Sequence, residues 1–211
     1  MKLREYQNNI AIQAANKLTA FGCCYLSMEC RTGKTLTALY AADKFNAKSV
    51  LFITKLKAIP SVKNDYIALQ PSFKLEVVNF ESSHKVTVKY DLVIIDEAHS
   101  LGAYPKPSKR TQEIRTICEG LPVLYLSGTP SPESYSQLYH QFWVCSKSPW
   151  KSYKSFYKWA KEYVYTRQKK VNGSLINDYS CANKPKIDND TRNLFISYSQ
   201  EQAGFEVNIN E

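Results

Sequence analysis

Two short segments of this 211-residue chain combine glycine, lysine, threonine and carboxylate residues in chemically suggestive patterns. The first, residues 29–35 (ECRTGKT), follows a short apolar run and precedes a helical pattern. Backbone N–H groups at the start of a helix bind anions, and a glycine there lets a phosphate approach the backbone closely. We therefore expect Gly33 to line a phosphate site, Lys34 to reach the β- and γ-phosphates, and the Thr35 hydroxyl to ligate Mg²⁺.

This segment departs from the strict phosphate-loop pattern at one position, because Met28 stands where that pattern has its first glycine. The tripeptide Gly-Lys-Thr is common, so an ordinary connection between a loop and a helix remains an alternative interpretation. Arg31 replaces a small residue, and it either adds charge near the phosphates or faces solvent.

The second segment, residues 92–99 (LVIIDEAH), places two carboxylates at the end of an apolar run. Asp96 is placed to hold Mg²⁺, directly or through water, and Glu97 to orient or deprotonate an attacking water. His99 would sense what lies across the site. An Asp-Glu pair after a strand is often an ordinary turn. The presence of Gly-Lys-Thr about sixty residues upstream favours a joint site, since both motifs need a strand end.

The apolar periodicity predicts the elements that would position these residues. We expect helices over 4–20, 34–45, 58–69, 108–119 and 132–143, and strands over 23–28, 49–54, 75–80, 92–96 and 123–127. Such alternation predicts an α/β fold, with a mostly parallel sheet flanked by helices on both faces. Ligands of such sheets bind at the carboxyl ends of the strands.

The segment from about 146 to 211 differs in composition, being rich in tyrosine and lysine. It contains one further strand-like run at 194–198 and an Asn-Gly turn signal at 172–173. We interpret it as a helical, basic extension of the same domain, and residues 1–145 as the main body.

The composition limits the classes of function. Lys and Arg number 28 against 19 Asp and Glu, a net charge of +9 that suggests a polyanionic partner, nucleic acid first. No run is long enough to span a membrane, and no signal-peptide core follows the N-terminus. The six cysteines lack zinc-site spacing. We expect a cytoplasmic protein with no membrane partner.

In order and spacing, these segments resemble a superfamily 2 helicase with a D-E-A-H box, of the Swi/Snf-like branch and in a form familiar from phage members. The matching segments are residues 3–7 (LREYQ, adenine-reading motif), 31–35 (RTGKT, motif I), 53–55 (ITK, motif Ia), 79–82 (NFES, motif Ib), 96–99 (DEAH, motif II) and 127–130 (SGTP, motif III). Residues 156–163 and 196–200 resemble, more loosely, the close of the first lobe in phage helicases.

The resemblance implies a RecA-like first lobe that binds ATP and Mg²⁺ as cofactors. In this resemblance Gln7, with Arg4, would read adenine, and the phosphates would be bound by Thr32, Gly33, Lys34 and Thr35. Thr35 and Asp96 would support the metal, and Glu97 would activate water. Coupling would fall to His99, Ser127 and Thr129, and nucleic-acid contact to Lys55. The implied site for phosphate-bond cleavage comprises Glu97, Lys34 and Asp96. If the gene is phage-encoded, the protein would work in the cytoplasm of a bacterial host.

The residues after motif III leave no room for a second RecA-like lobe, and no Q-x-x-x-R-x-x-R arginine-finger segment appears. Loss of an arginine finger costs on the order of 10³–10⁵ in rate. We therefore expect this chain alone to be a feeble ATPase. The sequence is either the N-terminal part of a longer helicase or one half of a split protein, and the second lobe would act in cis or in trans.

Residues 141–170 carry eight basic side chains and one acidic one. Four of the lysines, at spacings of three and four, predict one helical face opposite an aromatic side: Lys151, Lys154, Lys158 and Lys161. Either this helix packs its aromatic side on the core with its lysines solvated, or the lysines contact phosphates of a nucleic acid, with DNA favoured over RNA.

Three functions compete at this point. The first is the motor lobe of a nucleic-acid-dependent ATPase, a helicase or DNA translocase, favoured by Lys34, Thr35, Asp96 and Glu97 together. The second is a nucleic-acid-binding adaptor with a vestigial nucleotide site, which Met28 favours slightly. A small-molecule kinase is a weaker third, because such enzymes do not need the SGTP segment.

Overall fold

A computed structural model of the protein describes residues 3–171 and 173–204. Its α-helices are α1 (Glu5–Phe21), α2 (Lys34–Lys44), α3 (Ile59–Leu69), α4 (Lys109–Ile117), α5 (Gln137–Trp143), α6 (Phe156–Tyr163) and α7 (Lys184–Thr191). Its strands are β1 (Cys23–Met28), β2 (Ser49–Thr54), β3 (Lys74–Asn79), β4 (Leu92–Ile95), β5 (Val123–Ser127), β6 (Arg167–Val171), β7 (Ser174–Asp178) and β8 (Phe195–Tyr198). Short 3-10 turns are η1 (Leu56–Ala58), η2 (Phe80–Lys85) and η3 (Ala98–Leu101).

Six strands form the main sheet in the order β3-β2-β4-β5-β1-β8, and every neighbouring pair is parallel. Strands β4, β5 and β1 have almost wholly buried side chains, as expected for strands covered on both faces. The α/β class with a parallel sheet flanked by helices is thus confirmed, and the architecture is consistent with a RecA-like fold.

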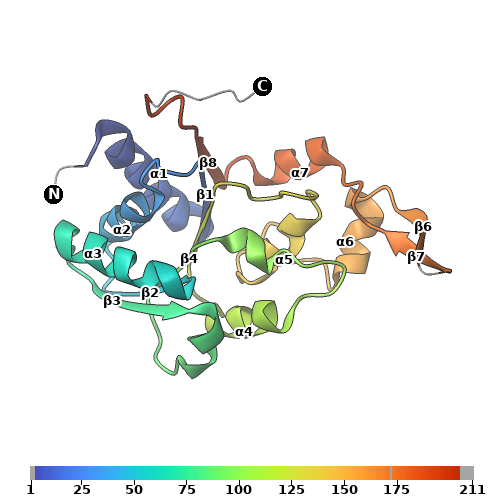
Figure 1. Ribbon diagram of the computed structural model, residues 1–211, viewed down its shortest axis with the longest axis horizontal. Coiled ribbons are helices and arrows are strands. Elements are labelled where there is room, and N and C mark those ends of the chain that lie inside the picture. Colours follow the sequence, from blue (N-terminus) through green and yellow to red (C-terminus); the bar gives the residue numbers. More distant parts are fainter. Residues whose placement is uncertain (1–2, 172, 205–211) are drawn as a thin grey trace.

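The two faces of the sheet support two hydrophobic clusters. One cluster holds Leu26 of β1 together with the buried faces of α1, α2 and α3. The other holds Tyr25 of β1 with buried side chains of α4, α5, α6 and α7. Because neighbouring residues of a strand point to opposite faces, β1 contributes to both clusters in alternation. Figure 1 shows these helices on the two sides of the sheet.

The segment after residue 145 packs on the second face and then returns to the sheet. Helix α6 buries Trp159 against α5 through Tyr139, with ring centroids 5.1 Å apart. Strand β8, predicted over 194–198, pairs with β1 and closes the sheet edge. Between these elements, β6 and β7 form a separate antiparallel hairpin. The extension is therefore less helical than the sequence predicts. Asn172 of the Asn-Gly signal and residues 205–211 lie outside the described residues.

Two sequence predictions are wrong in detail. The helix predicted over 132–143 begins only at Gln137, because its side-chain Oε1 accepts hydrogen bonds from the backbone N–H groups of Glu133 and Ser134 and holds the preceding residues in a turn. The basic row is not one helical face either, since Lys151 and Lys154 precede α6.

The remaining predicted elements agree with the structure to within about two residues at each end. Ser108 caps α4 by accepting a hydrogen bond from the Thr111 N–H, as its position before the helix predicts. No helix among the described ranges 3–171 and 173–204 is long and apolar enough to cross a lipid bilayer.

Candidate nucleotide site

The connection from β1 to α2 forms the loop that the sequence assigns to phosphate. Gly33 is the residue before α2 and has φ 77°, a left-handed conformation that favours glycine. A Cβ at Gly33 would lie 2.2 Å from the Nε2 atom of Gln7, so a larger residue does not fit without displacing that amide. Within the described part of the chain, no side chain caps the start of α2. The first N–H groups of this helix are therefore available to an anion.

The start of α1 lies over this loop. The Tyr6 hydroxyl donates to the carbonyl oxygen of Thr32 at 2.9 Å, and the Nε2 of buried Gln7 approaches the same oxygen at 3.5 Å. The backbone N–H of Arg4 donates to Gln7 Oε1 at 2.9 Å. The two predicted adenine-reading residues are thus joined to each other and lie beside the loop. Sequence reasoning missed Tyr6 as a support of the loop.

Inside the loop, the predicted ligands differ in what they contact. The Thr32 hydroxyl donates to the Glu29 carbonyl at 2.7 Å, so it stabilises the loop itself. The Lys34 amino group donates to the carbonyl of Met28. A Cβ at Gly128 would lie 3.7 Å from Lys34 Nζ, which places the loop after β5 against this lysine. Arg31 is exposed, with φ 64°, and Thr35 is half-buried in the first turn of α2.

Asp96 follows β4, and two neighbours donate hydrogen bonds to its carboxylate. Its Oδ2 accepts a 2.7 Å hydrogen bond from the Thr54 hydroxyl at the end of β2, and its Oδ1 accepts the Glu97 N–H at 3.0 Å. Burial raises the pKa of Asp96 above its ordinary value, while the Thr54 hydrogen bond and the charge of Lys34 act to lower it. Lys34 and Asp96 therefore interact electrostatically across β5, which separates their strands.

Glu97 adopts a left-handed conformation with φ 51°, which turns its side chain out of the strand direction. Its Oε1 lies 3.4 Å from Lys55 Nζ, and its Oε2 lies 3.3 Å from His99 Nδ1. Lys55, which the sequence assigns to nucleic acid, thus follows β2 and contacts the carboxylate that follows β4. An exposed pair of this kind contributes at most about 1 kcal/mol, so Lys55 can exchange Glu97 for another anion.

Ser127 ends β5, between the strands that carry Lys34 and Asp96. Its Oγ lies 3.0 Å from His99 Nδ1 and accepts the Thr129 N–H at 3.1 Å. The predicted coupling residues His99, Ser127 and Thr129 therefore form one hydrogen-bonded chain, and His99 Nδ1 also lies 3.3 Å from Glu97 Oε2. The Nε2 of Gln141, which sequence reasoning did not single out, binds the loop after β5 separately, by donating to the Pro130 carbonyl at 2.7 Å.

The predicted nucleic-acid lysines after residue 145 do not join this edge as a group. Lys151 and Lys154 line a hollow of about 340 Å³ together with Arg115, near the end of α4. Helix α4 leads back to the amino end of β5, so these two lysines lie toward the sheet edge opposite Lys34. Lys158 and Lys161 are exposed on α6.

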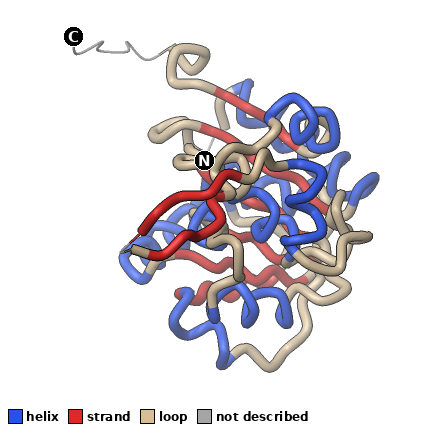
Figure 2. The backbone as a smooth tube through the Cα atoms, turned by 90° about the vertical axis from the view of Figure 1, so that its right-hand side faces the viewer, coloured by secondary structure: helices blue, strands red, loops and turns tan. Residues whose placement is uncertain are grey.

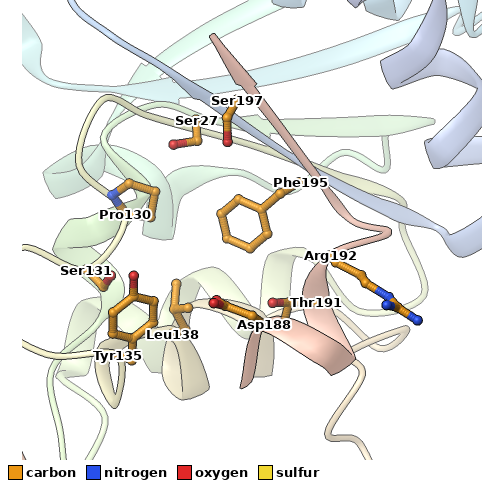
Figure 3. Close-up of a pocket in the computed structure, with 10 residues that line it drawn as sticks. All are labelled: Ser27, Pro130, Ser131, Tyr135, Leu138, Asp188, Thr191, Arg192, Phe195 and Ser197. Carbon is orange, nitrogen blue, oxygen red and sulfur yellow. The ribbon is translucent and has the colours of Figure 1, made fainter. Parts of the chain in front are cut away.

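A cavity of about 280 Å³ lies next to the site, on the other face of β1. Figure 3 shows its walls, which come from β1, the loop after β5, α5, α7 and β8: Ser27, Pro130, Ser131, Tyr135, Leu138, Asp188, Thr191, Arg192, Phe195 and Ser197. Pro130 is shared with the loop that carries Ser127 and Thr129. The segment after residue 145 therefore contributes half of this wall, which the sequence did not predict.

The donor set fits a nucleotide with Mg²⁺. The Thr35 hydroxyl and the Asp96 carboxylate would offer oxygen ligands, which Mg²⁺ prefers. This ion is usually held by one or two carboxylates together with substrate phosphates. Within residues 3–171 and 173–204, no three His, Cys, Asp or Glu side chains gather as an all-protein metal site. The uncapped start of α2 and the constraint at Gly33 fit the phosphates themselves.

The fold and site define an α/β protein with a Gly-Lys-Thr loop and an Asp-Glu pair at one edge of its parallel sheet. Comparison of the sequence with protein-family models gives no match, and comparison with curated proteins gives none either.

Proposed function

We propose that the chain is the first motor lobe of a nucleic-acid-dependent ATPase, a helicase or DNA translocase of the superfamily 2 type. The observation that carries this proposal is the order of three adjacent strands. Lys34 after β1, Ser127 at the end of β5 and Asp96 after β4 meet at one sheet edge.

In this proposal each residue of the edge has one task. Gln7 and Arg4 contact adenine, and the loop with Thr32, Gly33, Lys34 and Thr35 binds the phosphates. Thr35 and Asp96 would hold Mg²⁺, which when bound neutralises charge on the phosphates. Glu97 accepts a proton from the attacking water once Lys55 and His99 release its carboxylate. The hydrogen bonds of His99, Ser127 and Thr129 then couple the release of the Glu97 carboxylate to the position of the loop after β5.

Efficient hydrolysis would need a partner lobe. An arginine supplied in trans stabilises the charge of a phosphoryl-transfer transition state, with an effect on the order of 10³–10⁵ in rate. We propose that a second RecA-like lobe, in cis or in trans, supplies it. The activity would belong in the cytoplasm where nucleic acid and ATP meet, that of a bacterial host if the gene is phage-encoded.

Nucleic acid is the partner that the charge supports, with DNA favoured. Lys55 lies at the proposed catalytic edge, whereas Lys151, Lys154, Lys158 and Lys161 lie on other surfaces. If four lysines contact single-stranded phosphates, the logarithm of the association constant falls with the logarithm of salt at a slope of about −3, from about −0.7 per contact.

The adaptor alternative has one observation in its favour. Lys34 donates to the Met28 carbonyl, and the Met28 side chain is fully buried in the core. A loop that satisfies its own lysine would bind no phosphate if it were fixed in this form. In that case the chain would bind nucleic acid without using ATP.

The deciding experiment measures nucleotide binding and hydrolysis separately. A fluorescent ATP analogue should bind the chain with Mg²⁺, and Lys34→Met should weaken binding at least tenfold, whereas Lys44→Met at the other end of α2 should not. With the second lobe added, Glu97→Gln should retain binding and lose hydrolysis. If the two-lobed protein hydrolyses no ATP with any DNA or RNA, the motor proposal fails. A chain that binds nucleic acid but not the ATP analogue argues for the adaptor.

A further inference from the structure

The hairpin β6–β7 stands apart from the main sheet. Its strands pair in register from Arg167 opposite Asp178 to Val171 opposite Ser174. All residues of β6 are exposed, and so are all of β7 except Asp178. Figure 1 places the hairpin at the end of the molecule farthest from α3 and β3, and Figure 2 shows it in front of the sheet. Among the residues that the structure describes, none covers either of its faces.

This two-stranded ribbon, β6–β7, exposes apolar side chains, which is unusual for a strand surface without a partner. Leu175 is 66% exposed and Ile176 48%, although both sit in a strand. An isolated two-stranded hairpin is marginally stable in water. Leu175 pairs with Lys170 and Ile176 with Lys169, so each face of this marginally stable ribbon presents one exposed apolar side chain beside a cation. This arrangement favours a partner that covers both faces.

The charge of the ribbon is positive on both of its faces. Alternation along β6 puts Arg167 and Lys169 on one face, and Lys170 on the other. The one carboxylate of the ribbon, Asp178, lies opposite Arg167 and accepts a hydrogen bond from the Ser180 N–H at 2.9 Å. A polyanion that surrounds the ribbon on two sides would complement this pattern.

The base of the ribbon is held firmly. The hydroxyls of Ser134 and Ser136 donate 2.6 Å hydrogen bonds to the carbonyl oxygens of Ser180 and Tyr179, respectively. The backbone N–H of Tyr165 donates to the Cys181 carbonyl at 2.8 Å. Ser134 and Ser136 come shortly after Ser127 and Thr129 in the sequence. The ribbon is therefore hydrogen-bonded to the segment that follows the proposed ATP site.

The dimensions of the ribbon match one nucleic-acid form. Five residues per strand span about 17 Å at about 3.4 Å per residue. The major groove of B-form DNA, about 12 Å wide and 8.5 Å deep, admits a two-stranded ribbon. The major groove of A-form RNA is too deep and narrow for side chains to read. The size therefore favours duplex DNA over duplex RNA.

We propose that the hairpin β6–β7 enters the major groove of duplex DNA. Arg167 and Lys169 contact the phosphates on one wall of the groove and Lys170 those on the other. Leu175 lies beside Lys170 and Ile176 beside Lys169, so one apolar side chain packs against each wall. The proposal rests on the proposed function for its nucleic-acid partner, and it adds the form of the nucleic acid and the element that reads it.

The test compares two variants with equal loss of charge. The ribbon variant is Arg167→Gln/Lys169→Gln/Lys170→Gln. The control is Lys48→Gln/Lys63→Gln/Lys74→Gln, three exposed lysines around β2, α3 and β3. Fluorescence anisotropy measures binding of the full chain to a labelled 20-base-pair DNA duplex, the matching single strand and the matching RNA duplex across a salt series. Urea unfolding confirms that both variants keep the core.

The ribbon variant should bind duplex DNA at least about tenfold more weakly, with a salt slope less steep by roughly 2 to 3, from about 0.9 per lost phosphate contact. The control should keep the wild-type slope. A second ribbon variant, Leu175→Ala/Ile176→Ala, should weaken binding at an unchanged slope.

Three results would overturn the inference: equal losses in the ribbon variant and the control, a loss confined to single strands or RNA, or a wild-type chain that binds no duplex. Binding of the ATP analogue is measured on the same samples. If the ribbon binds duplex DNA but the chain does not bind the analogue, only the motor proposal is wrong. If the chain binds the analogue but the ribbon variant binds DNA like the control, only this inference is wrong.

Discussion

The hydroxyl of Thr54 donates a 2.7 Å hydrogen bond to the Oδ2 of Asp96, so the last residue of β2 orients the carboxylate that follows β4. The two strands are parallel neighbours, with Ile53 opposite Ile95. The pair therefore lies at equal height on the carboxyl edge. Thr54 acts through Asp96 and is a positioning residue for the proposed Mg²⁺ site.

Thr54→Val should weaken Mg²⁺-dependent binding of an ATP analogue about five- to tenfold, the effect of about 1 kcal/mol for one hydrogen bond. The Thr54 bond acts to lower the pKa of Asp96, so its loss raises that pKa further. The proton then competes with Mg²⁺ at a higher pH than in the wild type. Binding titrations against pH check this shift, and Thr54→Ser should restore the wild-type profile. An unshifted profile in Thr54→Val contradicts the assignment.

Two glycines with the same backbone conformation allow a matched comparison at the phosphate loop. Gly33 and Gly120 have φ 77° and 75°, but a Cβ at Gly120 would meet no atom of the described residues within 4 Å. Gly120→Ala should cost about 1–2 kcal/mol of unfolding free energy from the left-handed conformation alone. Gly33→Ala should cost more, because its Cβ also displaces Gln7, and it should reduce analogue binding. Urea unfolding and analogue titration check both, and equal effects would show that Gln7 does not restrict the loop.

His140 makes stability dependent on pH. Burial lowers its pKa from 6.5 to about 4, and its Nδ1–H donates to the Ala103 carbonyl at 2.6 Å. Below pH 6.5 the unfolded chain takes up a proton that the folded protein does not. The stabilising contribution is complete above pH 6.5 and is lost as the pH falls toward 4, by at most about 3 kcal/mol at about 1.4 kcal/mol per pKa unit.

Urea unfolding of His140→Gln at pH 7, 5.5 and 4.5 checks this prediction. The variant should lose the fall in stability over that range, since its side chain takes up no proton. His84→Gln, at an exposed position of η2, serves as the control and should keep the wild-type dependence. A wild-type slope in His140→Gln would mean that another group titrates.

Three of the aromatic residues of α6, Phe156, Trp159 and Tyr163, are core residues rather than base-stacking ones. Trp159 is fully buried and stacks on Tyr163 with ring centroids 5.0 Å apart. Trp159→Ala should lower the unfolding free energy by about 3–5 kcal/mol. Tyr157, which is exposed on the same helix, should lose less than about 1 kcal/mol when changed to alanine. Thermal unfolding checks the pair, and similar small losses in both would place α6 outside the core.

The pattern of apolar residues along the sequence predicted most helices and strands. It failed at the start of α5 and in the hairpin β6–β7. The run at 23–28 is a strand as predicted, because six apolar or small residues between turn signals suit a strand covered on both faces. The start of α5 was missed because the amide of Gln137 binds backbone N–H groups that a helix would otherwise leave open. The strands of the hairpin were missed because neither strand has a buried side to give a pattern of alternation.

The sequence by itself determined the α/β class and the positions of the chemical residues at strand ends, because both depend on periodicity and composition along a few neighbouring residues. Only the tertiary structure decided which strand ends meet. The order β4-β5-β1 sets Ser127 between Asp96 and Lys34, and the pairing of β2 with β4 brings Thr54 to Asp96, forty-two residues away. Strand order depends on long-range packing of buried faces, which apolar strands of similar composition do not specify locally.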